Sequence, residues 1–159
     1  MDSQHDPRLS GLAVEKALAI AAYGESVAAY RYRTLAEKTT SPPQRLIFQE
    51  MADEEQGHHV LIEKQLATHF PGSDFVLTAA DKDLVIVGPR MLEVNDERSF
   101  AETLRMIYES ELRTGRFYAA LHSTCKRPDL EPLLKEMADE CFEHAERIKA
   151  MVPRTGNSS

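Results

Sequence analysis

Residues 50–58 read EMADEEQGH, and residues 136–144 read EMADECFEH. The two stretches lie 86 positions apart, and the same offset aligns Glu25 with Glu111 without a gap. A gapless internal repeat of this kind indicates a duplicated structural unit. We therefore expect two copies of a helical hairpin, related to each other by an approximate two-fold axis.

Four long helical stretches follow from the apolar periodicity and from the start and stop signals around the repeat. The second stretch opens at Ser41, which is expected to cap it, with prolines in its first turn and Gln44 placed to complete a capping box. The third opens at Asp96 or at Ser99. The expected helices cover residues 9–38, 42–68, 96–125 and 128–152.

The connection between the second and third stretches, residues 69–95, loses the helical period, and only Leu84 to Val87 look extended. Short links make neighbouring helices antiparallel, whereas a connector of this length can run along a whole bundle. We therefore predict an all-α fold. It is an antiparallel four-helix bundle of the ferritin-like kind, with a long crossover between helices 2 and 3.

The chain has the length and the apolar content of one globular domain with a real core, because 42% of its 159 residues are hydrophobic. We expect a single domain over residues 1–152, made of hairpins 9–68 and 96–152. Residues 153–159 are expected to form a flexible tail.

Polar residues occupy inward positions on the expected helices. On the first helix the core stripe alternates spacings of four and three, which places Glu25 between Leu18 and Tyr32. The third helix places Glu111 in the same way. The remaining inward polar residues are Glu55 and His58 on the second helix and His144 on the fourth.

Three glutamates that converge in an apolar core need a compensating positive charge, because an unpaired buried carboxylate is costly. No lysine or arginine falls on these stripes in the central turns. Carboxylate oxygen and imidazole nitrogen are ligands of iron and manganese. The pattern therefore predicts a metal site between the helices.

The bulk composition narrows the partners and the compartment. A net charge of −7 and a pI near 5.4 argue against nucleic acid as a partner. The longest apolar run is too short for a membrane span, and the first residues do not read as a secretory signal. With only Cys125 and Cys141, a disulfide scaffold is not expected, and we predict a cytoplasmic protein.

The chain resembles the rubrerythrin branch of the ferritin-like superfamily. The stretch GESVAAYRY supplies an inward Glu25 followed seven residues later by Tyr32, and SELRTGRFY supplies Glu111 and Tyr118. The stretch MADEEQGHH supplies the Glu-x-x-His motif of the second helix. The fourth-helix stretch, MADECFEH, supplies a histidine.

This resemblance implies a non-haem centre of two iron ions, with manganese or zinc as alternatives. The implied ligands are Glu25, Glu55, His58, Glu111 and His144. Where the family pattern has a bridging glutamate on the fourth helix, this chain has Cys141. We expect Glu140, rather than the Cys141 thiol, to complete the site.

Rubrerythrins that carry a Cys-rich rubredoxin-like module can receive electrons within one chain, and this sequence has no such module. The resemblance therefore implies an external electron donor such as a rubredoxin-like protein. We also expect a homodimer, with neither nucleic acid nor membrane as a partner.

The expected activity is oxidation of iron(II) by dioxygen or peroxide, or reduction of peroxide. One alternative is a di-iron hydroxylase of an organic substrate. Another is a non-catalytic metal-binding bundle with a degenerate site.

Several neighbours of the expected ligands receive weaker interpretations. His59 is turned about 100° from His58 on the helix and is expected at the surface. Glu54 is expected on a solvated face. Tyr32 and Tyr118 are either core aromatics or hydrogen-bond donors to the glutamates.

Overall fold

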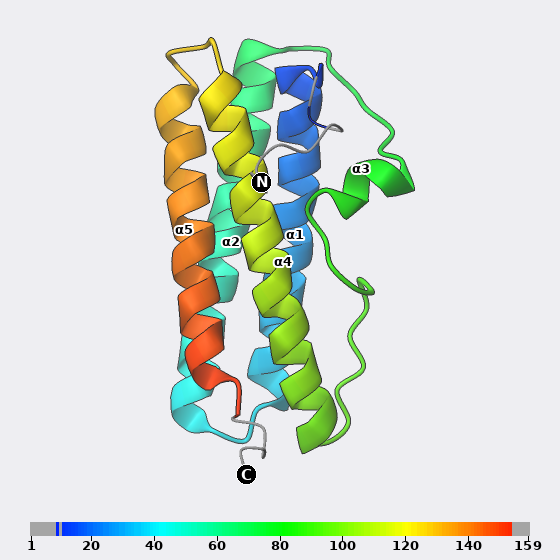
Figure 1. Cartoon of the computed structure of the whole chain (residues 1–159), viewed down its shortest axis with the longest axis vertical. Coiled ribbons are helices and arrows are strands. Elements are labelled where there is room, and N and C mark those ends of the chain that lie inside the picture. Colours follow the sequence, from blue (N-terminus) through cyan, green and yellow to red (C-terminus); the bar gives the residue numbers. More distant parts are fainter. Residues whose placement is uncertain (1–8, 10, 154–159) are drawn as a thin grey trace, which may run out of the picture.

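The four long helices form an antiparallel bundle (Figure 1) in the computed structural model, which describes residues 9 and 11–153. The helices are α1 (Val14–Lys38), α2 (Pro42–His69), α3 (Ala79–Asp83), α4 (Glu97–Thr124) and α5 (Glu131–Met151). Among the described residues there is no strand. The predicted all-α bundle is confirmed, and most of the predicted tail, residues 154–159, lies outside the described part.

The helix boundaries follow local capping chemistry. The Ser41 side chain accepts a hydrogen bond from the Gln44 amide, as predicted, but Gln44 does not return the bond because its side chain accepts from Thr39 instead. Of the two predicted starts of α4, the structure selects Asp96, whose carboxylate accepts from the Ser99 amide at 2.8 Å. Such a cap satisfies amides that the first helical turn would otherwise leave unpaired.

Two helices begin later than predicted. Helix α1 begins at Val14 rather than near Leu9, and α5 begins at Glu131 rather than at Pro128. Residues 128–130 form a turn, and the Leu130 amide donates to the Arg127 carbonyl at 2.9 Å. In both places the predicted first turn is not part of the helix.

Helix α1 packs along α2, and α4 packs along α5, so each half of the sequence repeat forms one hairpin. The apolar core lies in two clusters, one toward each end of the bundle. Fully buried leucines such as Leu18 and Leu134 belong to one cluster, and Phe48 and Ile148 to the other. Each such side chain contributes about 1.5–3 kcal/mol by leaving water, and the polar residues lie between these apolar ends.

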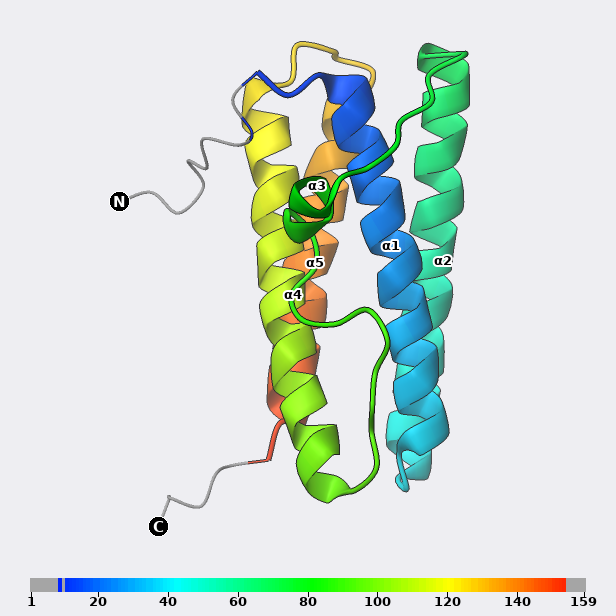
Figure 2. The ribbon, with the colours of Figure 1, turned by 90° about the vertical axis from the view of Figure 1, so that its right-hand side faces the viewer.

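The long crossover between α2 and α4 runs along the outside of α1 and α4 (Figure 2). It contains α3, which the sequence prediction missed. Thr78 and Asp81 cap this short helix reciprocally, and five residues are too few to show a helical period. The following residues Leu84, Val85 and Ile86 are buried against the bundle, although they pair in no sheet.

No helix in the described part of the chain is long and apolar enough to cross a membrane.

Candidate metal centre

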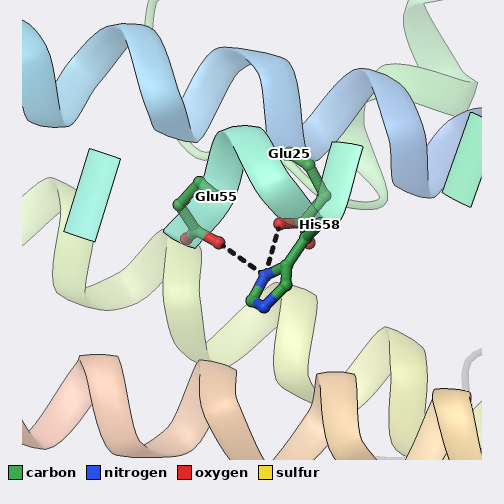
Figure 3. A group of neighbouring side chains, drawn as sticks. All are labelled: Glu25, Glu55 and His58. Carbon is green, nitrogen blue, oxygen red and sulfur yellow. Dashed lines mark hydrogen bonds and ion pairs between the residues drawn. The ribbon is translucent and has the colours of Figure 1, made fainter. Parts of the chain in front are cut away.

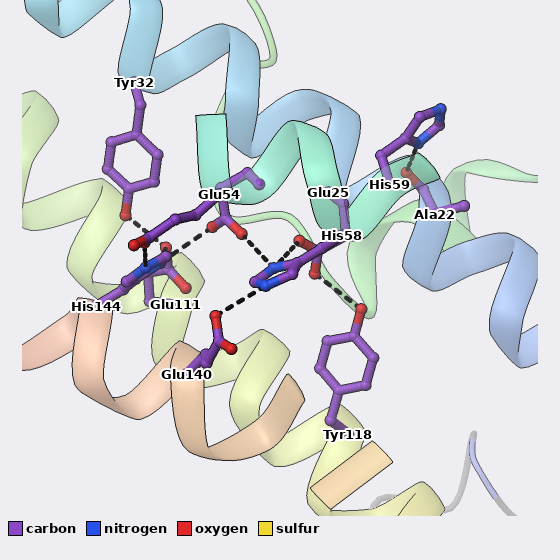
Figure 4. Close-up of polar contacts among 11 residues, drawn as sticks. Ala22, Glu25, Tyr32, Glu54, His58, His59, Glu111, Tyr118, Glu140 and His144 are labelled. Carbon is purple, nitrogen blue, oxygen red and sulfur yellow. Dashed lines mark hydrogen bonds and ion pairs between the residues drawn. The ribbon is translucent and has the colours of Figure 1, made fainter. Parts of the chain in front are cut away.

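Five of the six residues expected as ligands converge in the middle of the bundle. Figure 4 shows four of them, and Figure 3 shows the fifth, Glu55. Each comes from the helix on which the sequence pattern placed it, so all four long helices contribute. Four of the side chains are buried and that of His58 is nearly so, with 12% exposed. The set is Glu25 on α1, Glu55 and His58 on α2, Glu111 on α4 and His144 on α5.

The first group consists of Glu25, Glu55 and His58 (Figure 3). His58 Nδ1 lies 3.3 Å from Glu25 Oε1 and 3.1 Å from Glu55 Oε1. One ligand atom from each residue falls within 4.8 Å of the others. The three side chains could therefore hold one ion.

The second group consists of Glu55, Glu111 and His144. His144 Nδ1 lies 3.3 Å from Glu55 Oε2 and 3.4 Å from Glu111 Oε2. Glu55 therefore turns one carboxylate oxygen toward each group. It is the only residue common to the two groups found in the described part of the chain.

The two inward tyrosines are hydrogen-bond donors to the glutamates, which decides between the two interpretations of the sequence. Tyr118 donates to Glu25 Oε2 at 2.8 Å, and Tyr32 donates to Glu111 Oε2. Each bond crosses from one hairpin to the other. Burial, followed by the charges of the nearby glutamates, raises the pKa of both phenols well above the usual value, so both keep the proton that they donate.

A second crossed pair of contacts involves Glu54 and Glu140, which are equivalent in the sequence repeat. Glu140 Oε1 lies 2.8 Å from His58 Nε2, and Glu54 Oε1 lies 2.8 Å from His144 Nε2. Glu140, which was predicted as a ligand, therefore belongs to neither group. It contacts His58 Nε2, the ring nitrogen that points away from Glu25 and Glu55. Glu54 was expected on a solvated face but is partly buried. Its equivalence to Glu140 in the repeat is the sequence feature that could have predicted its contact with a histidine of the site.

His59 also differs from expectation. It is half-buried rather than at the surface, and its Nδ1 donates to the Ala22 carbonyl at 2.8 Å. This bond ties α2 to α1 near the site. The ring points away from both groups, as expected from its angular distance to His58 (Figure 4).

Cys141 occupies the position on α5 that is equivalent to Glu55, and it is 6% exposed. Burial, followed by the charges of Glu111, Glu25 and Glu55, raises the pKa of the thiol well above its usual value. The side chain is therefore a neutral thiol, and it lines a small cavity beside the carboxylates.

The electrostatics of the centre correct one step of the sequence argument. Burial would lower the pKa of both histidines, but hydrogen bonds to carboxylates raise the pKa of His58 to about 10 and that of His144 to about 12. Burial and the charges of Glu25 and Glu111 raise the pKa of Glu55. Protonated histidines can therefore balance the carboxylates, so charge balance alone does not require a metal.

Glu25 behaves differently from Glu55. Burial would raise its pKa, but hydrogen bonds with His58 and Glu55 and the charge of His58 lower it overall. The pKa values of the two carboxylates of the first group are thus shifted in opposite directions. Glu25 stays ionised, whereas Glu55 keeps a proton more readily than Glu25 does.

The donor set also fits a pair of divalent ions. Three carboxylates and two imidazoles form two groups around one shared carboxylate, and oxygen with nitrogen donors suits iron and manganese. Both histidines turn Nδ1 inward and have Nε2 occupied by a glutamate, the usual orientation device for a ligating imidazole.

The rubrerythrin family model matches residues 16–97, just over half of the chain, including Glu25, Glu55 and His58. The chain belongs to the rubrerythrin family. The part that matches the rubrerythrin model covers most of α1, all of α2 and the crossover. Glu111, Cys141 and His144 lie beyond the matched residues.

A solved structure supports the fold of this rubrerythrin-family chain. The hypothetical protein Pfu-1136390-001 from Pyrococcus furiosus superimposes with a TM-score of 0.78 over 92% of each chain, at 23% sequence identity. At this identity the likeness concerns the fold alone. No curated protein matches the chain.

Proposed function

We propose that the chain binds two iron ions and uses them to oxidise iron(II) with peroxide or dioxygen, or to reduce peroxide. The observation that carries this proposal is the sharing of Glu55, which presents one oxygen to each of two carboxylate and histidine groups. The ligands are Glu25, Glu55 and His58 for one ion and Glu55, Glu111 and His144 for the other. Manganese or zinc are alternative occupants.

Two adjacent iron ions would supply the two electrons that an O–O bond takes up when it is reduced. The residues of this chain provide the surroundings for that chemistry. Tyr32 and Tyr118 each donate a hydrogen bond to a carboxylate of the opposite hairpin, Glu111 and Glu25 respectively, here called the outer carboxylates. Burial of the site keeps bulk water away. Glu54 and Glu140, with 34% and 29% of their side chains exposed, connect each buried imidazole to solvent.

The electrons for repeated turnover would come from another protein, such as a rubredoxin-like electron donor. The family assignment supports a rubredoxin-like donor, and the two cysteines are too few to build a Cys-rich iron module within the bundle. A single round of oxidation should therefore proceed in the isolated chain, and repeated rounds should require the donor.

Elemental analysis and peroxide consumption test the proposal directly. Protein loaded anaerobically with iron(II) should hold about two ions per chain and consume about one hydrogen peroxide per two ions before it stalls. Adding reduced rubredoxin should restart consumption. Less than a tenth of an equivalent of metal, together with unchanged melting after chelation, would refute a metal function.

A second candidate function is a metal-binding or interaction bundle that has lost redox turnover. The observation that favours it is Cys141, which replaces a possible oxygen ligand with a neutral thiol at the centre. Under this reading the protein binds one or two ions but consumes no peroxide in the assay above. Metal content and peroxide consumption thus separate the two candidates.

Glu140→Gln and Glu54→Gln should each weaken iron binding by about tenfold to a hundredfold, because each removes the carboxylate that orients one histidine. Glu140→Gln should affect the ion bound by His58, and Glu54→Gln the ion bound by His144. Titration against a competing chelator measures both. Glu143→Gln, an exposed glutamate on the same helix as Glu140, is the control and should bind like the wild type.

Iron affinity should rise as the pH rises from 6 to 8. In the metal-free protein the pKa of His58 is about 10 and that of His144 about 12, so both imidazoles carry a proton that must leave before they can bind metal. Proton release on binding follows from calorimetry in buffers of different ionisation enthalpy. An affinity that is independent of pH over this range would show that the histidines are not ligands.

A further inference from the structure

Residues 83–89 of the crossover, here called the crossover wall, lie over α1 beside the candidate metal centre. Val85 is 1% exposed. A Cβ atom built on Gly24 would lie 3.0 Å from Val85 Cγ2, so the valine packs directly on the backbone next to Glu25. A side chain larger than glycine at this position would require the valine to move by a few tenths of an ångström.

Side chains of α4 hold the backbone of the crossover wall, which forms no helix or sheet after Asp83, the last residue of α3. Thr114 Oγ1 donates to the Val85 carbonyl at 2.9 Å, and the Val87 amide donates to Ser110 Oγ at 2.9 Å. Arg113 donates to the Ile86 carbonyl at 3.3 Å. Buried backbone groups without such partners would be costly, so these bonds set the position of Val85.

Arg31 of α1 adds bonds from a second helix. It is 2% exposed, and its Nη2 donates to the carbonyls of Val87 and Pro89 at 2.9 and 2.7 Å. Its Nη1 donates to Ser110 Oγ at 3.2 Å. The crossover wall is therefore bonded to both helices that carry the outer carboxylates, Glu25 and Glu111.

A small cavity lies between the crossover wall and the carboxylates. Its volume is about 20 Å³, which is room for about one water-sized molecule. Its lining includes Val85 and Ile86 of the crossover wall together with the site residues Glu25, Glu55, Glu111 and Cys141. A small molecule in this cavity would touch both the crossover wall and the shared carboxylate.

We propose that Val85 limits the substrate of the metal centre to molecules of the size of hydrogen peroxide or dioxygen. This inference rests on the proposed function. Reduction of hydrogen peroxide breaks its O–O bond, takes up two protons from solvent and two electrons from the reduced centre, and forms two waters. Bulky hydroperoxides and organic substrates do not fit between Val85 and the carboxylates, so a hydroxylase of a large organic substrate is disfavoured.

Access can be measured without metal, because Cys141 lines the same cavity and serves as a reporter. In a Cys125→Ser background, methyl methanethiosulfonate, a small reagent, should modify Cys141 at least about tenfold faster than a bulky aromatic disulfide. Val85→Ala should raise the rate with the bulky reagent about tenfold and change the rate with the small one less. Val76→Ala is the matched control, because Val76 lies in the same connection and is 93% exposed.

The access proposal is overturned if the wild type shows no preference for the small reagent. It is also overturned if Val85→Ala raises both rates in parallel, because general loosening of the fold would do that. Thr114→Val, which removes the bond to the Val85 carbonyl and keeps the side-chain volume, should reproduce the selective increase.

The second arm uses the iron-loaded protein with hydrogen peroxide and with cumene hydroperoxide. The wild type should consume hydrogen peroxide at least about tenfold faster, and Val85→Ala should narrow this ratio. Equal rates in the wild type would overturn the substrate limit. If the thiol selectivity is present but the protein binds no iron, the proposed function fails while the access limit at Val85 stands.

Discussion

Glu55→Gln is expected to weaken both iron positions at once, by at least about a hundredfold each, which corresponds to about 2.7 kcal/mol or more per ion. The reason is geometric, because Glu55 turns one oxygen to the His58 group and the other to the His144 group. Glutamine keeps the volume but loses the charge and one of the two acceptor oxygens. Isothermal titration and elemental analysis after gel filtration measure the loss.

Two matched variants make this result specific. Glu25→Gln should weaken one ion and leave the other, because Glu25 belongs to the first group only. Glu50→Gln changes an exposed glutamate on the same helix and should bind like the wild type. If Glu55→Gln lost one ion and kept the other at full affinity, Glu55 would not bridge, and the two-ion arrangement proposed above would be wrong.

Cys141→Glu is expected to strengthen binding of the ions by about tenfold to a hundredfold while destabilising the metal-free protein. Cys141 is the counterpart of Glu55 in the repeat and lines the cavity beside the carboxylates, so the longer side chain has some room. A fourth buried carboxylate near three others costs about 2–4 kcal/mol without metal. That cost should lower the melting temperature of the metal-free variant by roughly 5–15 °C.

Differential scanning calorimetry with and without iron measures both effects. Metal should raise the melting temperature of Cys141→Glu by more than it raises that of the wild type, because binding removes the repulsion. Cys141→Gln has the same size without the charge and should gain no affinity. Equal metal affinity in Cys141→Glu and Cys141→Gln would show that this position does not face the ions.

The sequence alone determined the bundle and most of the candidate site. The repeat and the helical period indicated two hairpins joined by a long crossover, and the structure has both. The same pattern indicated that Glu25, Glu55 and His58 point inward, and the structure places these three side chains in one group. These features are local, because a residue's face on a helix follows from its spacing to the neighbouring apolar residues. They could therefore be read from the chain without knowledge of its tertiary contacts.

Only the tertiary structure decided how the two hairpins meet. The bonds from Glu54 to His144, from Glu140 to His58 and from Tyr118 to Glu25 all cross between hairpins, and the last joins residues 93 positions apart. Helical spacing says which face a carboxylate occupies but not which ring nitrogen on another helix it will reach.

The crossover shows the same limit. Val85 follows a short capped helix without apolar period, and its position depends on bonds from Arg31 and Thr114 on two different helices to this segment. A segment without regular structure is positioned by whichever side chains satisfy its buried backbone groups. Those partners are distant in sequence, so only the folded chain could show that the crossover forms one wall of the site.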